Sequence, residues 1–101
     1  MNVATVGLCA GRHEIKTNDG QPVEQFIFQE IENPLDFEYL RSVSIAFNAA
    51  LDVFGADVLH LYVTGLTSAL TAFLAVCSTP DSVILMHFNR ETGKYEPQVF
   101  Y

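Results

Sequence analysis

Hydrophobic residues occur in short runs along the chain. These runs are separated by polar segments that contain glycine and proline. Runs of four to eight apolar and β-branched residues bounded by turn residues are typical of strands. The predicted strands are Val3–Leu8, Val23–Ile31, Val58–Val63, Val83–Phe88 and Tyr95–Tyr101. The third and fourth runs are almost continuously apolar, which is typical of parallel strands that are covered on both faces.

A helical spacing replaces the strand pattern twice. Apolar residues recur at steps of three and four over Leu35–Phe54, and Ser68–Cys77 is rich in Ala and Leu. Asn33 is the expected N-cap of the first helix, with Pro34 at its first position and Gly55 as its C-cap. The face expected to be buried consists of Phe37, Leu40, Ser44, Phe47 and Leu51.

The elements follow the order ββαβαββ, which predicts one small Rossmann-like α/β domain over residues 1–101. Strands two to four alternate with helices, so they are expected to be parallel in a mostly parallel central sheet. The turn residues Asn18-Asp19-Gly20 favour an antiparallel hairpin between the first two strands. Residues 89–94 predict a terminal hairpin, and Pro97 suits an edge strand.

The net charge of −7, with only five Lys and Arg, changes the range of possible partners. A duplex-binding protein needs a clustered basic face, so long nucleic acid and anionic membranes are not expected partners. A small anionic ligand remains possible, because helix N-termini and one or two arginines can hold it. Half the residues are hydrophobic, and some of these must be exposed in so small a domain, which favours a homodimer.

The chain shows no signal-peptide pattern, and its longest apolar stretch, Leu66–Cys77, is far shorter than the ~20 residues that span a bilayer. Cys9 and Cys77 have neither metal-ligand spacing nor the pattern of a disulfide framework. We therefore expect a cytoplasmic protein with reduced cysteines, no metal and no cofactor.

Candidate ligand-binding residues lie at the carboxyl ends of the parallel strands, where open α/β sheets bind ligands. The turn after the third predicted strand combines hydroxyl groups, a glycine and a helix start, a combination suited to holding phosphate. These residues are Thr64, Gly65, Thr67 and Ser68. The alternative is an ordinary tight turn with a threonine cap, because the segment lacks the lysine of a P-loop.

His87, Asn89 and Arg90 leave the neighbouring strand at the same edge. Arg90 is a candidate to pair with phosphate, and His87 to contact a ribose or act as an acid or base, so these two are the catalytic candidates. The alternative is a solvated hairpin beside a partly buried strand histidine.

Three other groups of polar residues have simpler structural interpretations. In Gly11-Arg12-His13-Glu14, a histidine between an arginine and a glutamate could be tuned for acid–base chemistry. This cluster joins the site only if the first strand runs parallel to the others or if a second subunit supplies it, and a charged loop is the simpler interpretation. His60 alternates with apolar neighbours and is interpreted as a core or interface residue. The carboxylates around residues 30–38 are explained by the positive end of the first helix.

The second half of the chain resembles small CRISPR-accessory proteins of the CARF-like Rossmann type. The resemblance rests on VLHLYVTGLT, SALTAFLAVC, VILMHF and the ending GKYEPQVFY, with GQPVE fitting the same outline. It implies a homodimer that binds a cyclic oligoadenylate, with ligand contacts at the Thr64–Ser68 turn. No helical pattern between Cys9 and Gln21 matches the first helix of that group.

Three functions follow from these observations. The favoured one is a binding module that sequesters or senses a cyclic nucleotide messenger of antiviral defence. An alternative is a metal-independent ring nuclease that uses Thr64, Thr67, His87 and Arg90. Another is a phage or mobile-element protein whose apolar surface and acidic charge block a host protein.

Overall fold

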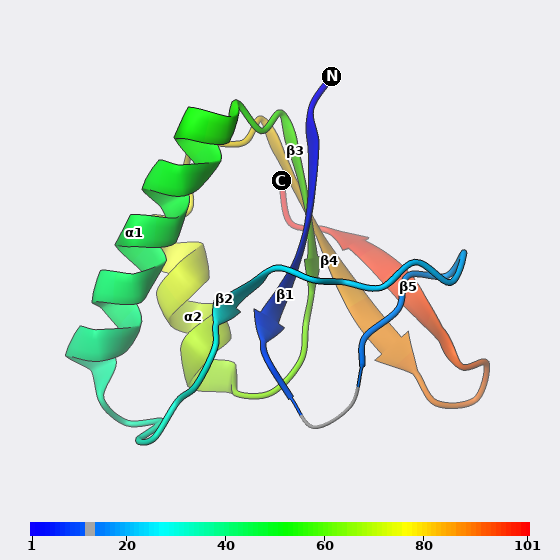
Figure 1. Cartoon of the computed structure of the whole chain (residues 1–101), viewed down its shortest axis with the longest axis horizontal. Helices are drawn as coiled ribbons and strands as arrows, with labels where there is room; N and C mark the ends of the chain where they lie inside the picture. The colour runs from blue at the N-terminus through cyan, green and yellow to red at the C-terminus, as the bar shows by residue number, and fades with distance from the viewer. Residues whose placement is uncertain (12–13) are drawn as a thin grey trace.

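A five-stranded sheet carries two helices on one of its faces in the computed structural model, which describes residues 1–11 and 14–101 (Figure 1). The elements occur in the predicted order. They are β1 (Val3–Cys9), β2 (Phe26–Phe28), α1 (Phe37–Phe54), β3 (Val58–Tyr62), α2 (Thr67–Val76), β4 (Ser82–Asn89) and β5 (Lys94–Val99).

The strands lie in the order β2-β1-β3-β4-β5, parallel from β2 to β4, with β5 antiparallel at the edge. The expected antiparallel hairpin between the first two strands is wrong, because β1 and β2 are parallel. The turn at residues 18–20 instead closes a much shorter hairpin, in which Lys16 bridges to Pro22. We call this hairpin, residues 15–23, the arm. Val23, the expected first residue of the second strand, belongs to the arm, and β2 is only three residues long instead of spanning Val23–Ile31.

The path of the chain explains why helices cover only one face. The connections from β2 to β3 and from β3 to β4 cross the sheet in the same direction, so right-handed crossovers place α1 and α2 on the same side. The connection from β1 to β2 runs the opposite way and therefore belongs on the other side. The arm lies there, across the sheet from the helices (Figure 1).

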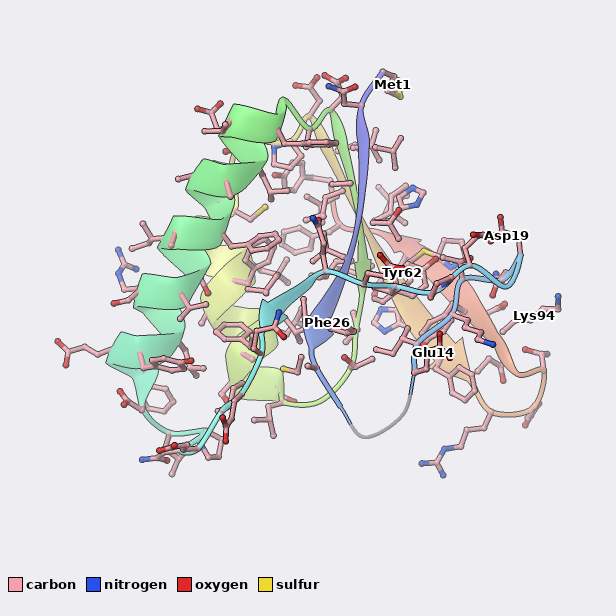
Figure 2. The ribbon with its side chains drawn as sticks, in the orientation of Figure 1. Met1, Glu14, Asp19, Phe26, Tyr62 and Lys94 are labelled. Carbon is pink, nitrogen blue, oxygen red and sulfur yellow. The ribbon has the colours of Figure 1, made fainter. Side chains whose placement is uncertain are left out.

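Each face has its own hydrophobic cluster. Alternate residues such as Val6, Leu61 and Leu85 point to the helices and pack in the larger cluster with Leu40 and Phe73. The second cluster lies beneath the arm. It contains Ile15, Val23, Tyr62, Met86 and Tyr95, with the Tyr62 and Tyr95 rings edge to face at 4.7 Å between centroids. Figure 2 shows Tyr62 on this side of the sheet.

Asn18 fastens the arm to the edge of the sheet. Its side-chain Nδ2 donates to the Tyr95 carbonyl at 3.0 Å, and its Oδ1 accepts from the Tyr95 N–H at 2.8 Å. These backbone groups of β5 point away from β4, because Phe100 donates to Val83 and the N–H direction alternates along a strand. Pro97, two residues on, has no N–H to offer. The edge of β5 is thus largely closed to another strand.

The first helix begins two residues later than expected. Asp36, not Asn33, is its N-cap and accepts from the Tyr39 N–H, while Asn33 accepts from the Leu35 N–H in the preceding turn. Phe37 is consequently 63% exposed instead of part of the buried face. Leu40, Ser44 and Leu51 are buried as predicted. Gly55 is the C-cap, with a left-handed φ of 74°.

Two further expectations concern membrane crossing and the state of the cysteines. Across the described ranges, neither helix combines the length and the apolar character that a membrane crossing requires. Both cysteines are free thiols.

Replacing Asn18 with Ala is expected to lower the free energy of unfolding by about 1–3 kcal/mol, since two hydrogen bonds to a partly buried backbone are lost at once. Urea denaturation measures the change. Hydrogen exchange at the Tyr95 amide should accelerate in parallel. Gln21→Ala, an exposed substitution in the same arm, is the control and should leave both measurements near wild type. Equal stability of the two variants would show that the arm is not held by Asn18.

Candidate functional site

A cavity of ≈ 550 Å³ opens at the carboxyl ends of β1 and β3, on the side that carries the arm. The parallel direction of β1 brings its carboxyl end, at Cys9, beside the turn after β3. We call it the carboxyl-edge cavity. It is lined by Cys9, Gly11, Glu14, Ile15, Thr64, Gly65, Phe88 and Tyr95.

Thr64 lines the cavity, but its hydroxyl is already engaged. Thr64 Oγ1 donates to the Cys9 carbonyl at 2.9 Å and accepts from the Cys9 N–H at 3.3 Å. The side chain thus extends the pairing of β1 and β3 beyond the last strand residues. The hydroxyl keeps one lone pair and no proton for a ligand.

Gly65 is required by the shape of the turn. Its φ is +84°, and a Cβ atom there would lie 3.1 Å from Cys9 Cβ and 3.2 Å from Cys9 Sγ. The close approach seats the thiol over the start of α2, where the Leu66 N–H hydrogen-bonds to it. The cysteine therefore occupies part of the space in which a phosphate was expected.

Thr67 and Ser68 begin α2 but do not line the cavity. Ser68 Oγ donates to the Pro34 carbonyl at 2.8 Å and ties this turn to the segment before α1. The helix N-cap is Leu66, which makes no side-chain hydrogen bond, so the alternative of a threonine cap is wrong. The first N–H groups of α2 consequently lack a side-chain partner.

The residues expected from β4 lie apart from the cavity. His87 is half-buried, and its Nε2 is 2.6 Å from the Gln98 side-chain oxygen on β5. Asn89 accepts from the Glu91 N–H within the hairpin turn, and Arg90 is exposed in that turn. The structure therefore brings together Thr64 and Gly65 of the predicted set and does not join the others to them at this cavity.

Aromatic side chains that the sequence analysis did not single out form one wall. Phe88 and Tyr95 are paired across β4 and β5, with their ring centroids 5.3 Å apart. Tyr95 is buried, whereas Phe88 is 54% exposed. The alternation of Ile84, Met86 and Phe88 along β4 places Phe88 on the arm side, and this pattern was available in the sequence.

Glu14 is the charged residue of the lining and lies on the arm side of the sheet (Figure 2). Its carboxylate is 3.9 Å from Lys16 Nζ, an exposed pair that leaves the acid free to accept from a ligand. Arg12 and His13, the remaining candidates in this loop, lie outside the described residues. β1 is parallel to β2 and β3, which is one of the two arrangements in which these residues could join the site.

Burial is the main cause of the pKa shifts around the cavity. Burial raises the pKa of the Cys9 thiol, and the hydrogen bond from Leu66 N–H only partly opposes it. Burial likewise raises the pKa of Tyr95, and that of Tyr62 with smaller contributions from Asp19 and Tyr95. These groups are neutral at physiological pH, so the cavity holds neither a thiolate nucleophile nor a phenolate.

In the described ranges, no three His, Cys, Asp or Glu side chains lie close enough together to hold a metal ion. His60 lies in the middle of β3, in register with Thr5 and Ile84, and is half-buried on the arm side of the sheet. It is therefore not a fully buried core residue, and its interpretation as an interface residue stays a prediction.

Comparisons of the chain with protein-family models, with curated proteins and with solved structures find no match. What the carboxyl-edge cavity binds is therefore inferred from its own residues.

Gly65→Ala is expected to destabilise the fold more than Gly93→Ala. Both glycines have positive φ, which costs a residue with a Cβ atom about 1–2 kcal/mol. Only at Gly65 does the new methyl group also press against Cys9, since nothing lies within 4 Å of the Cβ position at Gly93. Thermal denaturation of both variants measures the difference. Equal losses would mean that the Cys9 contact is relieved without cost.

The Cys9 thiol is expected to react slowly with a disulfide reagent at pH 8 in a Cys77→Ala background. A raised pKa leaves a smaller thiolate fraction at each pH than in a free cysteine. The reaction rate should keep rising with pH beyond the point where a cysteine peptide levels off. A rate at pH 7 that matches or exceeds the peptide would show that the Leu66 N–H outweighs burial.

Proposed function

We propose that this protein binds a nucleotide in the carboxyl-edge cavity and holds it without cleaving it, with a cyclic oligoadenylate as the ligand class. Two copies related by a two-fold axis would each receive part of one ring. The observation that carries the proposal is the half-exposed Phe88 ring beside Tyr95 at a cavity that also contains a carboxylate.

The location and size of the cavity support small-molecule binding. It lies outside the carboxyl ends of parallel strands, the position at which open α/β sheets bind ligands. Its volume of ≈ 550 Å³ falls within the range of about 300–1,000 Å³ that is usual for such sites. The lining is mainly apolar, with few polar groups, as expected for a site that selects by shape and a small number of hydrogen bonds.

The chemistry of the walls supports a planar base with an amino group. An exposed phenyl ring offers a stacking surface, and stacking of a base on an aromatic ring contributes about 1–3 kcal/mol. The Glu14 carboxylate accepts hydrogen bonds only, so it favours a donor such as the exocyclic amine of adenine.

The same geometry favours binding over cleavage. The Thr64 hydroxyl donates its proton to the Cys9 carbonyl, and His87 contacts the Gln98 side chain away from the cavity. A ring nuclease needs groups that orient a ribose hydroxyl and stabilise the developing charge at one point. The four residues considered for that role do not converge at this cavity.

The exposed apolar side chains support a second copy. Large hydrophobic residues are exposed at both ends of α1, among them Phe37, Tyr39 and Val53. Exposed apolar patches commonly lie in an interface. A symmetrical ring-shaped ligand matches a two-fold dimer, because each protomer can present the same cavity to it.

The test is a thermal-shift screen against cyclic di-, tri-, tetra- and hexanucleotides, followed by titration of any hit. A ligand at 100 times its Kd stabilises the folded state by about 2.7 kcal/mol, a shift that is easily measured in a small domain. Chromatography after incubation should return the ligand intact. If no nucleotide raises the melting temperature, the proposal is wrong. If chromatography finds cleaved product, the protein turns the ligand over instead of only binding it.

Phe88→Ala is expected to weaken binding of the hit by about tenfold or more, the loss of a base–aromatic stack. Phe100→Ala is a closely matched control. Its ring packs on Tyr101 at 5.6 Å and 58°, much as Phe88 packs on Tyr95 at 5.3 Å and 59°, but it does not line the cavity. Equal affinity of the two variants would place the ligand elsewhere.

A further inference from the structure

The outer edge of β1 is only partly paired. Its neighbour β2 contributes three residues, and the register joins Gly7 to Phe26 and Cys9 to Phe28. On the opposite side, β1 is paired with β3 from Val3 onward. The amino-terminal half of β1 therefore has a strand on one side and none on the other in the described part of the chain.

The backbone groups on this edge can be assigned from the alternation of the strand. The Gly7 N–H points outward and donates to the Gln25 carbonyl at 2.8 Å, whereas the Asn2 carbonyl points inward and accepts from Val58. Val3 and Thr5 share the outward direction of Gly7, because successive residues alternate. Their N–H and C=O groups lie where an added strand would pair.

An apolar groove of ≈ 410 Å³ runs along this edge, and α1 forms its other wall. We call it the β1 groove. It is lined by Val3, Ala4, Thr5, Glu24, Gln25, Phe26, Gln29, Phe47, Ala50, Leu51 and Phe54. Val3 is 45% exposed and Phe54 56% exposed, so hydrophobic surface reaches the mouth of the groove. Figure 1 shows α1 and β1 on either side of this space, with β2 at its lower end.

We propose that the β1 groove binds an extended peptide segment of a partner protein, which adds to the sheet as a strand beside β1. The peptide backbone pairs with the outward groups of Val3 and Thr5. Alternate apolar side chains of the peptide insert between β1 and the α1 residues Phe47, Ala50 and Phe54. Its basic side chains face Glu24 at the rim.

The position of α1 favours a peptide over a second copy of the chain. Neighbouring strands lie about 4.7–4.9 Å apart, so one extended chain fits beside β1. A second copy that paired through its own β1 would also bring its α1, which packs on the β2 side of the sheet. The two helices would then lie over adjacent strands, closer than the 8–10 Å that packed helices need.

Charge favours a basic partner. The chain carries −7, and the charged residue of the groove lining is Glu24. A segment that alternates Lys or Arg with Val, Ile or Leu places its apolar residues in the groove and its cations toward the acidic surface. The opposite edge of the sheet does not compete for such a segment, because Asn18 and Pro97 close β5.

The probe is a capped hexapeptide that alternates lysine and valine, titrated into ¹⁵N-labelled protein. Amide shifts are expected at Val3, Thr5 and Phe26, with no comparable change at Thr64 or Tyr95. A version N-methylated at alternate residues, so that one edge cannot donate hydrogen bonds, should bind at least about tenfold more weakly. The counterpart that replaces lysine with glutamate should bind more weakly as well.

Two variants of neighbouring alanines test the location. Ala50 lines the groove and Ala49 does not, and both are exposed on α1. Ala50→Arg should therefore reduce peptide affinity at least about tenfold by filling the groove with a like charge, while Ala49→Arg should bind as wild type. Both variants should keep the wild-type melting temperature, because neither alanine is part of the buried core.

Three results would overturn the proposal. The first is the absence of groove shifts at millimolar peptide. The second is equal affinity of the Ala50→Arg and Ala49→Arg variants. The third is a concentration dependence of the Val3 and Thr5 amides without peptide, which would show that a second copy occupies the edge. None of these depends on nucleotide binding at the carboxyl-edge cavity, so the two proposals can fail separately.

Discussion

The four parallel strands need cover on both faces, and both helices lie on the same one. The direction of the crossovers dictates this arrangement, because the chain moves across the sheet the same way from β2 to β3 and from β3 to β4. Cover for the other face can come only from the connection between β1 and β2. That connection is the arm, a hairpin instead of a helix, and it reaches only the carboxyl half of the face.

The carboxyl-edge cavity and the β1 groove both follow from this substitution. The arm spans the sheet to β5 and returns, and the β2 that follows it has only three residues, so the outer edge of β1 stays half paired. At the carboxyl end, Glu14 and Ile15 line the carboxyl-edge cavity together with Thr64 and Gly65. A helix in place of the arm would have covered more of the face and left less open space.

The sequence predicted the elements that depend on local pattern. Long apolar runs gave β3 and β4 to within one residue at each end, and the spacing in α1 identified Leu40, Ser44 and Leu51 as buried. The pairing of the first two strands was harder to predict, because the turn at residues 18–20 indicates a hairpin but not its length. Of the site, the edge of the sheet and the Thr64–Gly65 turn were predicted. Phe88 and Tyr95 were missed because their proximity depends on the register of β4 against β5.

Phe26 contributes to the β1 groove and to the packing beside the carboxyl-edge cavity. It lines the β1 groove and also packs against the cluster beneath the arm, which includes Tyr95 of the carboxyl-edge cavity. Its ring lies over Gly7 so closely that a Cβ atom at that position would overlap it. A side chain at residue 7 would displace the ring and with it the start of β2. Because residue 7 is glycine, the Phe26 ring can lie over β1, where it lines the β1 groove and packs against the cluster beneath the arm. The geometry of the β1 groove and of the carboxyl-edge cavity therefore depends on Gly7.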